Sequence, residues 1–367
     1  VQAGAGDMRS RAAARTLHRK DEKMTKPVLA ITMGDAAGIG AEITVKALMK
    51  PEIYTQAVPV VIGDRAAIAD AIQFCKAPLE LHVIQQPEEA EGRYGVIDLI
   101  DLGYLTPGGW AYKTVSALTG DASYQYVAKG IALAMEKRAH AVVTGPINKE
   151  AINLAGHHYA GHTEIFAKLT GTKDYAMLLS SDSLRVIHVT THVSMREACD
   201  RVTTERVSAV IRLADEALRL MGVRNPRIAV AGLNAHCSEN GLFGFEEQKW
   251  IIPAIQAMQA VGLCVDGPIP PDTVFVKALG GMYDIVVAMY HDQGHIPLKT
   301  VGFVYDRDKQ AWKAVEGVNV TLGLPIIRTS VDHGTGFALA GKGTSNELSL
   351  VNAIDYAVKM TNGRNKQ

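Results

Sequence analysis

The amino-acid sequence predicts an α/β fold, in which mostly parallel strands are covered by helices. Short runs rich in Val, Ile and Leu alternate with longer segments of helical periodicity, which is typical of this class. Several of the apolar runs lead straight into a loop that contains glycine or histidine, as strands do where a parallel sheet binds its ligand. A chain of 367 residues is long enough for one large or two medium domains.

The expected elements follow from these patterns in chain order. Apolar runs of strand length lie at 27–33, 58–62, 140–144, 184–191, 227–233 and 284–290. Amphipathic periodicity predicts helices at 41–48, 122–137, 195–221 and 246–260. Because the carboxyl ends of parallel strands meet at one edge of a sheet, we expect the loops after these strands to converge on a single cleft.

The division into domains is expected to be discontinuous, because the sequence has no repeat of fixed period and no Pro/Ser-rich linker. We expect residues 24–145 and 325–367 to form a first α/β lobe and residues 146–324 to form a second lobe with the metal-ligand histidines described below. Residues 1–23 lack apolar periodicity, and we interpret them as a disordered extension or a segment added for expression. An organellar transit peptide is the alternative, which the acidic residues in this segment disfavour.

Composition argues against several classes of function. Lys plus Arg and Asp plus Glu both number 38, so no global charge draws the protein toward nucleic acid or an anionic membrane. Four cysteines without a Cys-x-x-Cys pair indicate neither a disulfide framework nor a thiolate zinc site. No apolar run approaches the roughly 20 residues that span a bilayer. We therefore expect a soluble, cytoplasmic protein that acts on a small molecule.

Three histidines follow expected strands and are candidate metal ligands. His192, His236 and His291 stand in the loops THV, GLNAH and YHDQGH, which should share one cleft. Three neutral imidazoles bind a borderline divalent ion well and leave coordination positions open for substrate oxygens. Asp292 and Asn234 could each fix the tautomer of a neighbouring imidazole, or could be turn-forming side chains.

A second set of residues suggests recognition of an anion. Lys299, Arg328 and His162 stand in GHIPLK, PIIRTS and GHTE, beside residues typical of structured loops. Arg can bind a phosphate or carboxylate through two parallel hydrogen bonds, Lys adds a point charge, and Thr163 can donate to the same oxygens. Ion pairing at the surface is the alternative role for each of the charged residues.

The segment GDAAGIG follows the first expected strand and precedes a helix. Backbone N–H groups in such a position can bind an anion at the amino end of the helix. The spacing of Gly34, Gly38 and Gly40 matches neither the dinucleotide-binding fingerprint nor the P-loop. A tight turn that needs glycine is the alternative interpretation.

Taken together, the motifs resemble those of the 4-hydroxythreonine-4-phosphate dehydrogenase family, within the isocitrate and isopropylmalate dehydrogenase-like superfamily. The segments that carry the resemblance occur in the family's order: GDAAGIGAE, TGPINKE, GHTE, TTHV, GLNAH, YHDQGH and GVNVTLGLPIIRTSVDHGT. They extend over nearly the whole chain from Met24 onward, so the resemblance is specific. It implies a two-lobed α/β fold with mostly parallel sheets.

The resemblance also implies roles for individual residues. His192, His236 and His291 would be ligands of a divalent metal, which could be Zn, Mg, Mn or Co. The substrate and its phosphate would be bound by His162, Thr163, Lys299, Asn319 and Arg328. The cofactor would be NAD. The active site would lie between the lobes and at a homodimer interface, with His192 reaching into the partner's site.

Several positions depart from the vitamin B6 members of that family. These positions are Ala36, Ala235, Cys237, Ser238, His295, Ile296 and the additional segment 304–316. The departures resemble the catabolic branch, the 4-phospho-D-threonate and 4-phospho-D-erythronate dehydrogenases. A pocket that accepts a hydroxyl in place of a substrate amine should not pair with an ammonium group, and His295 is a plausible place for that change.

We therefore expect oxidation of the C3 hydroxyl of a 4-phosphorylated four-carbon acid, followed by decarboxylation to dihydroxyacetone phosphate and CO2. The alternatives are 4-hydroxythreonine-4-phosphate dehydrogenase of pyridoxal phosphate biosynthesis, a three-histidine phosphate-ester hydrolase, and a non-catalytic phosphate-binding or metal-storage protein. The sequence leaves open the physiological acid, the preferred metal, the choice between NAD and NADP, and the general acid and base. Lys299 and Asp292 are candidates for the last two roles.

Overall fold

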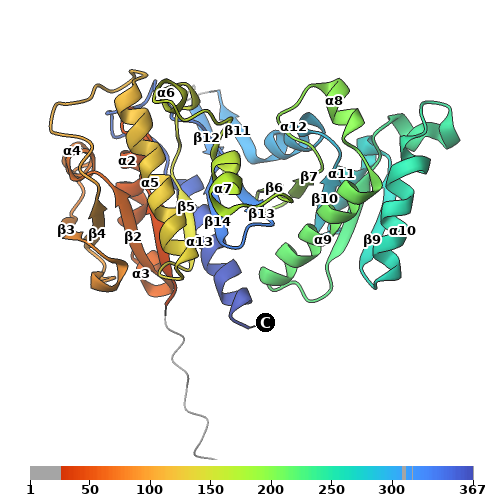
Figure 1. Cartoon of the computed structure of the whole chain (residues 1–367), viewed down its shortest axis with the longest axis horizontal. Coiled ribbons are helices and arrows are strands. Elements are labelled where there is room, and N and C mark those ends of the chain that lie inside the picture. Colours follow the sequence, from red (N-terminus) through yellow and green to blue (C-terminus); the bar gives the residue numbers. More distant parts are fainter. Residues whose placement is uncertain (1–25, 308–310, 316, 367) are drawn as a thin grey trace, which may run out of the picture.

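The computed structural model describes residues 26–307, 311–315 and 317–366, and these residues form a long, mixed α/β molecule (Figure 1). Twelve of the described strands belong to one sheet. In their order across the sheet these strands are β3 (Glu80–Ile84), β4 (Val96–Asp101), β2 (Val58–Gly63), β1 (Val28–Thr32), β5 (Ala141–Thr144), β14 (Ile327–Val331), β13 (Val318–Leu322), β6 (Ala176–Ser180), β7 (Arg185–His188), β10 (Ile285–Ala288), β8 (Arg227–Ala231) and β9 (Cys264–Ile269).

Most neighbouring strands in this sheet are parallel. The exceptions lie in the middle, where β13 runs antiparallel to both β14 and β6, and β6 runs antiparallel to β7. Strand β14 pairs in parallel with β5, so a segment near the end of the chain lies beside one from its first half. The mostly parallel, helix-covered sheet confirms the predicted α/β class.

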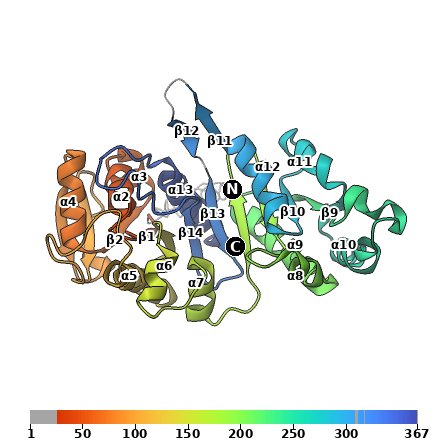
Figure 2. The ribbon, with the colours of Figure 1, turned by 90° about the horizontal axis from the view of Figure 1, so that it is seen from above.

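Helices cover both faces of the sheet, as the view from above shows (Figure 2). The helices are α2 (Gly40–Leu48), α3 (Pro51–Gln56), α4 (Arg65–Cys75), α5 (Ala117–Met135), α6 (Lys149–Leu154), α7 (His162–Thr170), α8 (Met195–Asp200), α9 (Thr204–Leu220), α10 (Ile252–Ala260), α11 (Pro271–Leu279), α12 (His291–Gly302) and α13 (Leu348–Arg364). Three short turns are η1 (Pro87–Glu89), η2 (Ala235–Gly241) and η3 (Glu247–Ile251), and a separate antiparallel hairpin pairs β11 (Phe303–Asp306) with β12 (Ala311–Val315).

All six expected strands are present, but two expected helices differ from the prediction. The segment 195–221 forms two helices because Thr203 begins a new one, its hydroxyl accepting a hydrogen bond from the backbone N–H of Arg206. The segment 246–260 begins with the π-helical turn η3, and α10 follows with proline in its first turn. The first break follows side-chain capping and the second lies beside a proline, and apolar periodicity reports neither feature.

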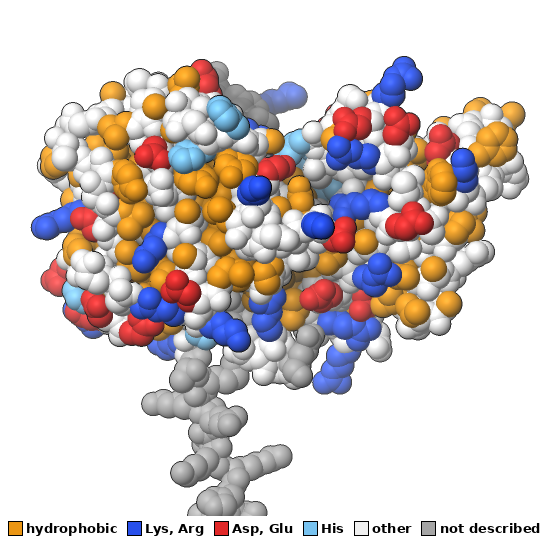
Figure 3. All heavy atoms as spheres, viewed as in Figure 1, with side chains coloured by type: hydrophobic (Ala, Val, Ile, Leu, Met, Phe, Trp, Pro, Cys, Tyr) orange, Lys and Arg blue, Asp and Glu red, His pale blue; other side chains and the backbone are white. Residues whose placement is uncertain are grey.

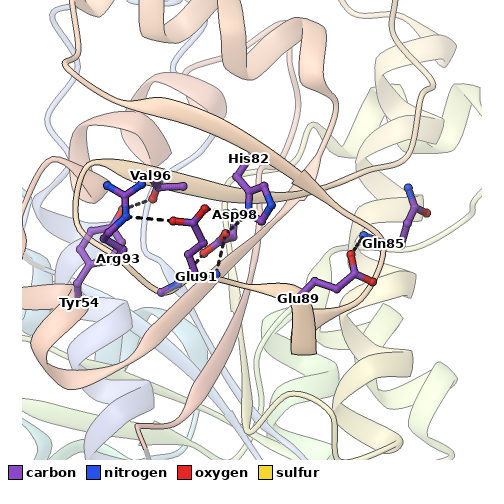
Figure 4. A network of polar contacts seen from close by, with 9 residues as sticks. Tyr54, His82, Gln85, Glu89, Glu91, Arg93, Val96 and Asp98 are labelled. Atoms are coloured by element: carbon purple, nitrogen blue, oxygen red, sulfur yellow. Dashed lines mark hydrogen bonds and ion pairs between the residues drawn. The ribbon is translucent and has the colours of Figure 1, made fainter.

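The outer strands β3 and β4 are joined by a buried carboxylate (Figure 4). Asp98 on β4 is 1% exposed and accepts hydrogen bonds from the backbone N–H groups of Glu91 and Gly92. The His82 ring on β3 lies with its Nδ1 2.8 Å from the same carboxylate. Beside this group, the Tyr54 hydroxyl donates to the carbonyl of Val96 at 3.0 Å. His82 therefore has a structural role.

Two expectations are not decided by this fold. Residues 1–23 lie outside the described residues. The boundaries of the lobes, 24–145 with 325–367 and 146–324, stay a prediction, although α13 packs against β14 and β5. In the described part of the chain, no helix combines the length and apolar character needed to cross a membrane.

Candidate active site

A cavity of about 340 Å³ lies at the carboxyl ends of β5 and the neighbouring strands. It is lined by residues of the loop after β5, the first turn of α7, strands β13 and β14, and α12. All five predicted substrate residues line it, and so does one predicted metal ligand: His162, Thr163, Lys299, Asn319, Arg328 and His192. Small-molecule sites of about 300 Å³ or more are common, so this volume suits a small acid.

Arg328 is the most unusual residue of this cavity, because it is charged and 2% exposed. Its guanidinium donates to Thr321 Oγ1 at 3.0 Å, to Thr144 Oγ1 at 2.9 Å and to Asn319 Oδ1 at 3.3 Å, all neutral oxygens. Its Nε has no hydrogen-bond partner among the described residues. Burial lowers the pKa of Arg328 to about 9, so it still bears its charge at neutral pH.

The first turn of α7 places further groups that are able to bind an anion beside Arg328. The N-cap residue is Gly161, which has no side chain to satisfy the first N–H groups of the helix. Thr163 is 7% exposed, and its hydroxyl lies 3.5 Å from that of Thr321. The Nε2 of His162 is buried without a partner in the described part of the chain. Burial, together with the nearby charge of Arg328, holds the pKa of His162 well below its usual range, so this ring is neutral.

Four histidine rings lie together at the other side of the cavity. The ring centroids of His192 and His291 are 5.7 Å apart, and His295 stacks on His291 at 3.6 Å. The ring of His188, at the end of β7, lies 4.8 Å from His295. Burial, with the nearby His291, lowers the pKa of His295 to about 4, so it is neutral at pH 7. Figure 3 shows the surface hollowed between the part with α5 and the part with α8, with histidine side chains visible there.

Two carboxylates lie beside predicted metal ligands. Asp292 Oδ1 lies 2.6 Å from Nδ1 of His291, which leaves Nε2 of that ring as the nitrogen able to bind a metal. Of the two roles considered for Asp292, this contact supports the orienting one. Glu164 Oε1 lies 3.6 Å from Nδ1 of His192. Sequence reasoning missed Glu164, although it stands next to two predicted substrate residues in GHTE.

His236 is not part of this arrangement within one chain. Its side chain is 62% exposed and pairs with Glu239 at 3.3 Å. Among the described residues, no group of three or more His, Cys, Asp or Glu is placed to hold a metal ion. The chain thus brings His192 and His291 together as two suitable imidazole donors, whereas a three-histidine centre would need a group from outside this cluster. The three-ligand set stays a prediction.

The loop that bears His236 has an unusual backbone. Residues 236–240 all have positive φ, between 44° and 70°, and none of them is glycine. A left-handed conformation costs about 1–2 kcal/mol for each such residue, so surrounding contacts must hold the loop. Asn234 donates hydrogen bonds from its side-chain amide to the carboxylates of Glu246 and Glu247. These contacts support the role of Asn234 as a turn-forming side chain, which was the alternative to fixing the tautomer of an imidazole.

The glycines of GDAAGIG are explained by close backbone contacts. A Cβ on Gly34 would lie 2.4 Å from the carbonyl oxygen of Pro146, and one on Gly38 would lie 2.5 Å from that of Thr335. A Cβ on Gly40 would lie 2.2 Å from the oxygen of Met33. None of the three glycines lines the cavity. The turn interpretation therefore accounts for these glycines. Through Gly34 the loop packs against Pro146, which lines the cavity.

Asp332 is a cavity residue that the sequence argument missed. It follows β14 directly and lines the cavity beside Lys299. Burial raises the pKa of Asp332 to about 6, against the opposing charge of Lys299. A carboxyl group that titrates near neutral pH is suited to proton transfer. Lys299 also lines the cavity, whereas Asp292 does not. Of the two candidates named for the general acid and base, Lys299 is therefore the better placed.

The chain is similar to known dehydrogenases over most of its length. It is 45% identical to a D-threonate 4-phosphate dehydrogenase of Cupriavidus necator, with 92% of this chain and 98% of that protein covered. It is 47% identical to a protein of the same name from Salmonella typhimurium, with 92% and 100% covered. A putative D-threonate 4-phosphate dehydrogenase of Oceanobacillus iheyensis is 48% identical, with 91% and 98% covered.

Solved structures agree with these relatives. A 4-hydroxythreonine-4-phosphate dehydrogenase from Klebsiella pneumoniae has a TM-score of 0.80 and 45% identity, with 92% of this chain and all of that chain covered. A terephthalate 1,2-cis-dihydrodiol dehydrogenase from Burkholderia xenovorans has a TM-score of 0.64 and 29% identity, with 91% and 98% covered. Residues 55–357 match the family described as pyridoxal phosphate biosynthetic protein PdxA, and the chain therefore belongs to this family of hydroxyl-oxidising dehydrogenases.

Proposed function

We propose that the protein oxidises the C3 hydroxyl of 4-phospho-D-threonate or 4-phospho-D-erythronate with NAD and then decarboxylates the product to dihydroxyacetone phosphate. The observation on which this proposal rests is the buried guanidinium of Arg328, whose hydrogen bonds go to neutral oxygens only. A buried cation with such partners is stabilised by an anionic ligand. The names of the relatives from Cupriavidus and Salmonella support a phosphorylated threonate as that ligand.

The cavity has cationic and hydrogen-bonding groups for both anionic ends of such a substrate. Arg328, Thr163 and the first N–H groups of α7 form one group of donors. Lys149 and Lys299 add positive charge at the cavity wall. A substrate held at its phosphate and its carboxylate has its C2 and C3 oxygens fixed between them, which orients the C3 hydrogen toward the cofactor.

The reaction needs a hydride acceptor and a base. The C3 hydride passes to NAD, and the hydroxyl proton passes to a group of the cavity, for which Lys299 and Asp332 are the candidates. The resulting β-keto acid loses CO2, and protonation of the enolate that remains gives dihydroxyacetone phosphate. The hydride thus goes to NAD, the hydroxyl proton goes to the cavity group, and the carboxyl carbon leaves as CO2.

We further propose a divalent metal, Zn, Mg, Mn or Co, held by His192, His236 and His291. When bound, such an ion would supply positive charge that stabilises the developing alkoxide and enolate oxygens. The proposal is supported by the neighbouring rings of His192 and His291 and by Asp292, which leaves Nε2 of His291 available. Because His236 lies apart from that pair in one chain, we propose that a homodimer completes the site and that this dimer is cytoplasmic. This proposal differs from the expectation that His192 reaches into the partner's site, because His192 lies beside His291 of its own chain.

The neutral ring of His295 favours the catabolic substrates over the vitamin B6 substrate. It lines the cavity and is 8% exposed. A neutral imidazole offers a hydrogen bond to a C2 hydroxyl but no negative charge to pair with a C2 ammonium group. 4-Hydroxythreonine-4-phosphate, for which the similar Klebsiella structure is named, is the second candidate substrate.

The proposal is tested by following NADH formation from 4-phospho-D-threonate, before and after complete removal of metal. We expect NADH and CO2 to form in equal amounts with metal present, and turnover to cease after chelation and return when the ion is added back. Full activity after thorough chelation would contradict the metal requirement. Release of inorganic phosphate without NADH would instead indicate the three-histidine hydrolase.

A further inference from the structure

We propose that Glu247 is a positioning residue, which holds the loop that bears His236 in its left-handed conformation. This inference rests on the proposed function, in which His236 is a metal ligand. Glu247 is 1% exposed, although it stands in a sequence of polar residues at the start of η3. A carboxylate this deeply buried needs several hydrogen bonds, and it accepts them from Leu233, Asn234 and Ser238 in the loop after β8.

The two oxygens of Glu247 hold different parts of this loop. Oε1 accepts hydrogen bonds from the backbone N–H groups of Leu233 at 2.8 Å and Asn234 at 2.7 Å, where the chain leaves β8. Oε2 accepts from the side-chain amide of Asn234 at 3.0 Å and from the hydroxyl of Ser238. Ser238 is fully buried and is the third of the five left-handed residues. Glu247 thus binds the loop on both sides of His236.

This arrangement is needed because the loop has no glycine where its backbone is left-handed. Residues 236–240 would relax toward right-handed or extended conformations if nothing held them. Such a change would move His236, which lies between the two contact points of Glu247. The side chain of His236 is itself exposed, so packing of its own ring does not fix its position.

A second buried side chain connects the start of this loop to His291. Gln293 donates from Nε2 to the carbonyl of Gly232 at 2.8 Å, and its Oε1 accepts from the backbone N–H of Met289 at 2.6 Å. Gly232 and Met289 follow the neighbouring strands β8 and β10 directly. The loop that Glu247 holds is therefore also anchored to the segment that leads into α12 and its first residue, His291.

The neighbouring acid Glu246 provides a matched control. Its carboxylate accepts a hydrogen bond from the side-chain amide of Asn234 at 2.7 Å, and the residue is only partly buried. The variants Glu247→Gln and Glu246→Gln make the same chemical change at adjacent positions. In Glu247→Gln one acceptor oxygen becomes an NH2 donor that faces other donors, so the loop loses contacts on at least one side of His236.

The first measurement is hydrogen exchange of the metal-free, full-length protein at the amides of residues 233–241. We expect exchange there to become at least tenfold faster in Glu247→Gln, and to change less than twofold in Glu246→Gln. The second is a calorimetric titration with Co²⁺. Loss of a group that orients a ligand typically weakens metal binding by about 10–100-fold, and we expect that loss in Glu247→Gln only.

Unchanged exchange and unchanged Co²⁺ affinity in Glu247→Gln would overturn the inference. If that variant does not fold, Ser238→Ala removes the hydroxyl that donates to Glu247 and that also accepts a long contact from Asn234. It should show the same pattern at smaller amplitude, and no effect there would also overturn the inference. His236→Ala separates the two proposals. If it binds Co²⁺ as the wild type does, the proposed metal centre is wrong, while faster exchange in Glu247→Gln would still support Glu247 as the residue that holds the loop.

Discussion

Replacement of Arg328 by methionine tests whether this residue serves ligand binding or the stability of the fold. The guanidinium is buried and makes its hydrogen bonds to Thr144, Thr321 and Asn319. Methionine keeps much of the side-chain length but removes the charge and every N–H donor. If Arg328 is present to bind the substrate anion, Arg328→Met should impair catalysis far more than it impairs folding.

The magnitudes follow from the contacts. A hydrogen bond to a charged group contributes about 1.5–3 kcal/mol, so loss of two bonds to an anion costs about 3–6 kcal/mol. Since about 1.4 kcal/mol corresponds to a tenfold change, kcat/KM should fall by roughly 10²- to 10⁴-fold. Folding loses the bonds to two buried threonine hydroxyls and the longer bond to Asn319, but a charge without an anionic hydrogen-bond partner is no longer buried. We therefore expect the free energy of unfolding to change by less than about 2 kcal/mol.

The assay has two parts. Urea unfolding gives the stability of the wild type and of Arg328→Met, and thermal unfolding with added inorganic phosphate reports on the anion site. Phosphate should raise the Tm of the wild type and leave that of the variant unchanged. If the variant instead lost more than about 4 kcal/mol of stability while KM stayed the same, Arg328 would be structural and our reasoning would be refuted.

The remaining predictions concern titrating groups and packing. Burial raises the pKa of Asp332 from 3.8 to about 6, so ionisation destabilises the fold as pH rises through that range. Asp332→Asn should therefore remove a pH-dependent loss of about 3 kcal/mol between pH 4 and pH 7, measured by urea unfolding, and an unchanged pH profile would contradict this. The carboxylate of Asp98 raises the pKa of His82, so their contact stabilises the fold fully below pH 6.5 and is lost as pH rises above the folded pKa. His82→Gln should thus lower the urea midpoint more at pH 5.5 than at pH 8.5, and an equal loss at both would show that the pair does not titrate. A Cβ on Gly294 would lie 2.4 Å from Nε2 of His188. Gly294→Ala should displace the histidine rings and lower the free energy of unfolding by about 1–3 kcal/mol. A Tm within error of the wild type would show that α12 accommodates the methyl group without loss of stability.

The sequence was most informative where strands are buried on both faces. The expected strands at 58–62 and 227–233 correspond to β2 and β8, because strands of a parallel sheet read as continuous apolar runs. Strand β3 was missed, since ELHVI lies at the sheet edge and alternates polar with apolar residues. Strand β13 was missed because VNVTL has polar residues that face the cavity and the core.

The site was predictable to the extent that loops leave their strands at a common edge. Arg328 and Asn319, on adjacent antiparallel strands, line the same cavity as His162, as the family resemblance implied. For His236 the three-ligand set stays a prediction, because the position of a strand end gives the place where a loop begins and not its course. After β8 the chain enters a left-handed turn, and among the described residues His236 forms no three-ligand group with His192 and His291. Nothing in the apolar pattern reports such a turn, whereas a buried glutamate in a polar segment could have suggested one.

We propose above that this cavity oxidises a phosphorylated hydroxy acid of the threonate type. Its most direct test is a side-by-side measurement of kcat/KM for NADH formation from 4-phospho-D-threonate, 4-phospho-D-erythronate and 4-hydroxythreonine-4-phosphate, with the same enzyme and metal. We predict that one of the first two is used at least tenfold more efficiently than the third. Equal or better use of 4-hydroxythreonine-4-phosphate would contradict the account and place the enzyme with the vitamin B6 dehydrogenases.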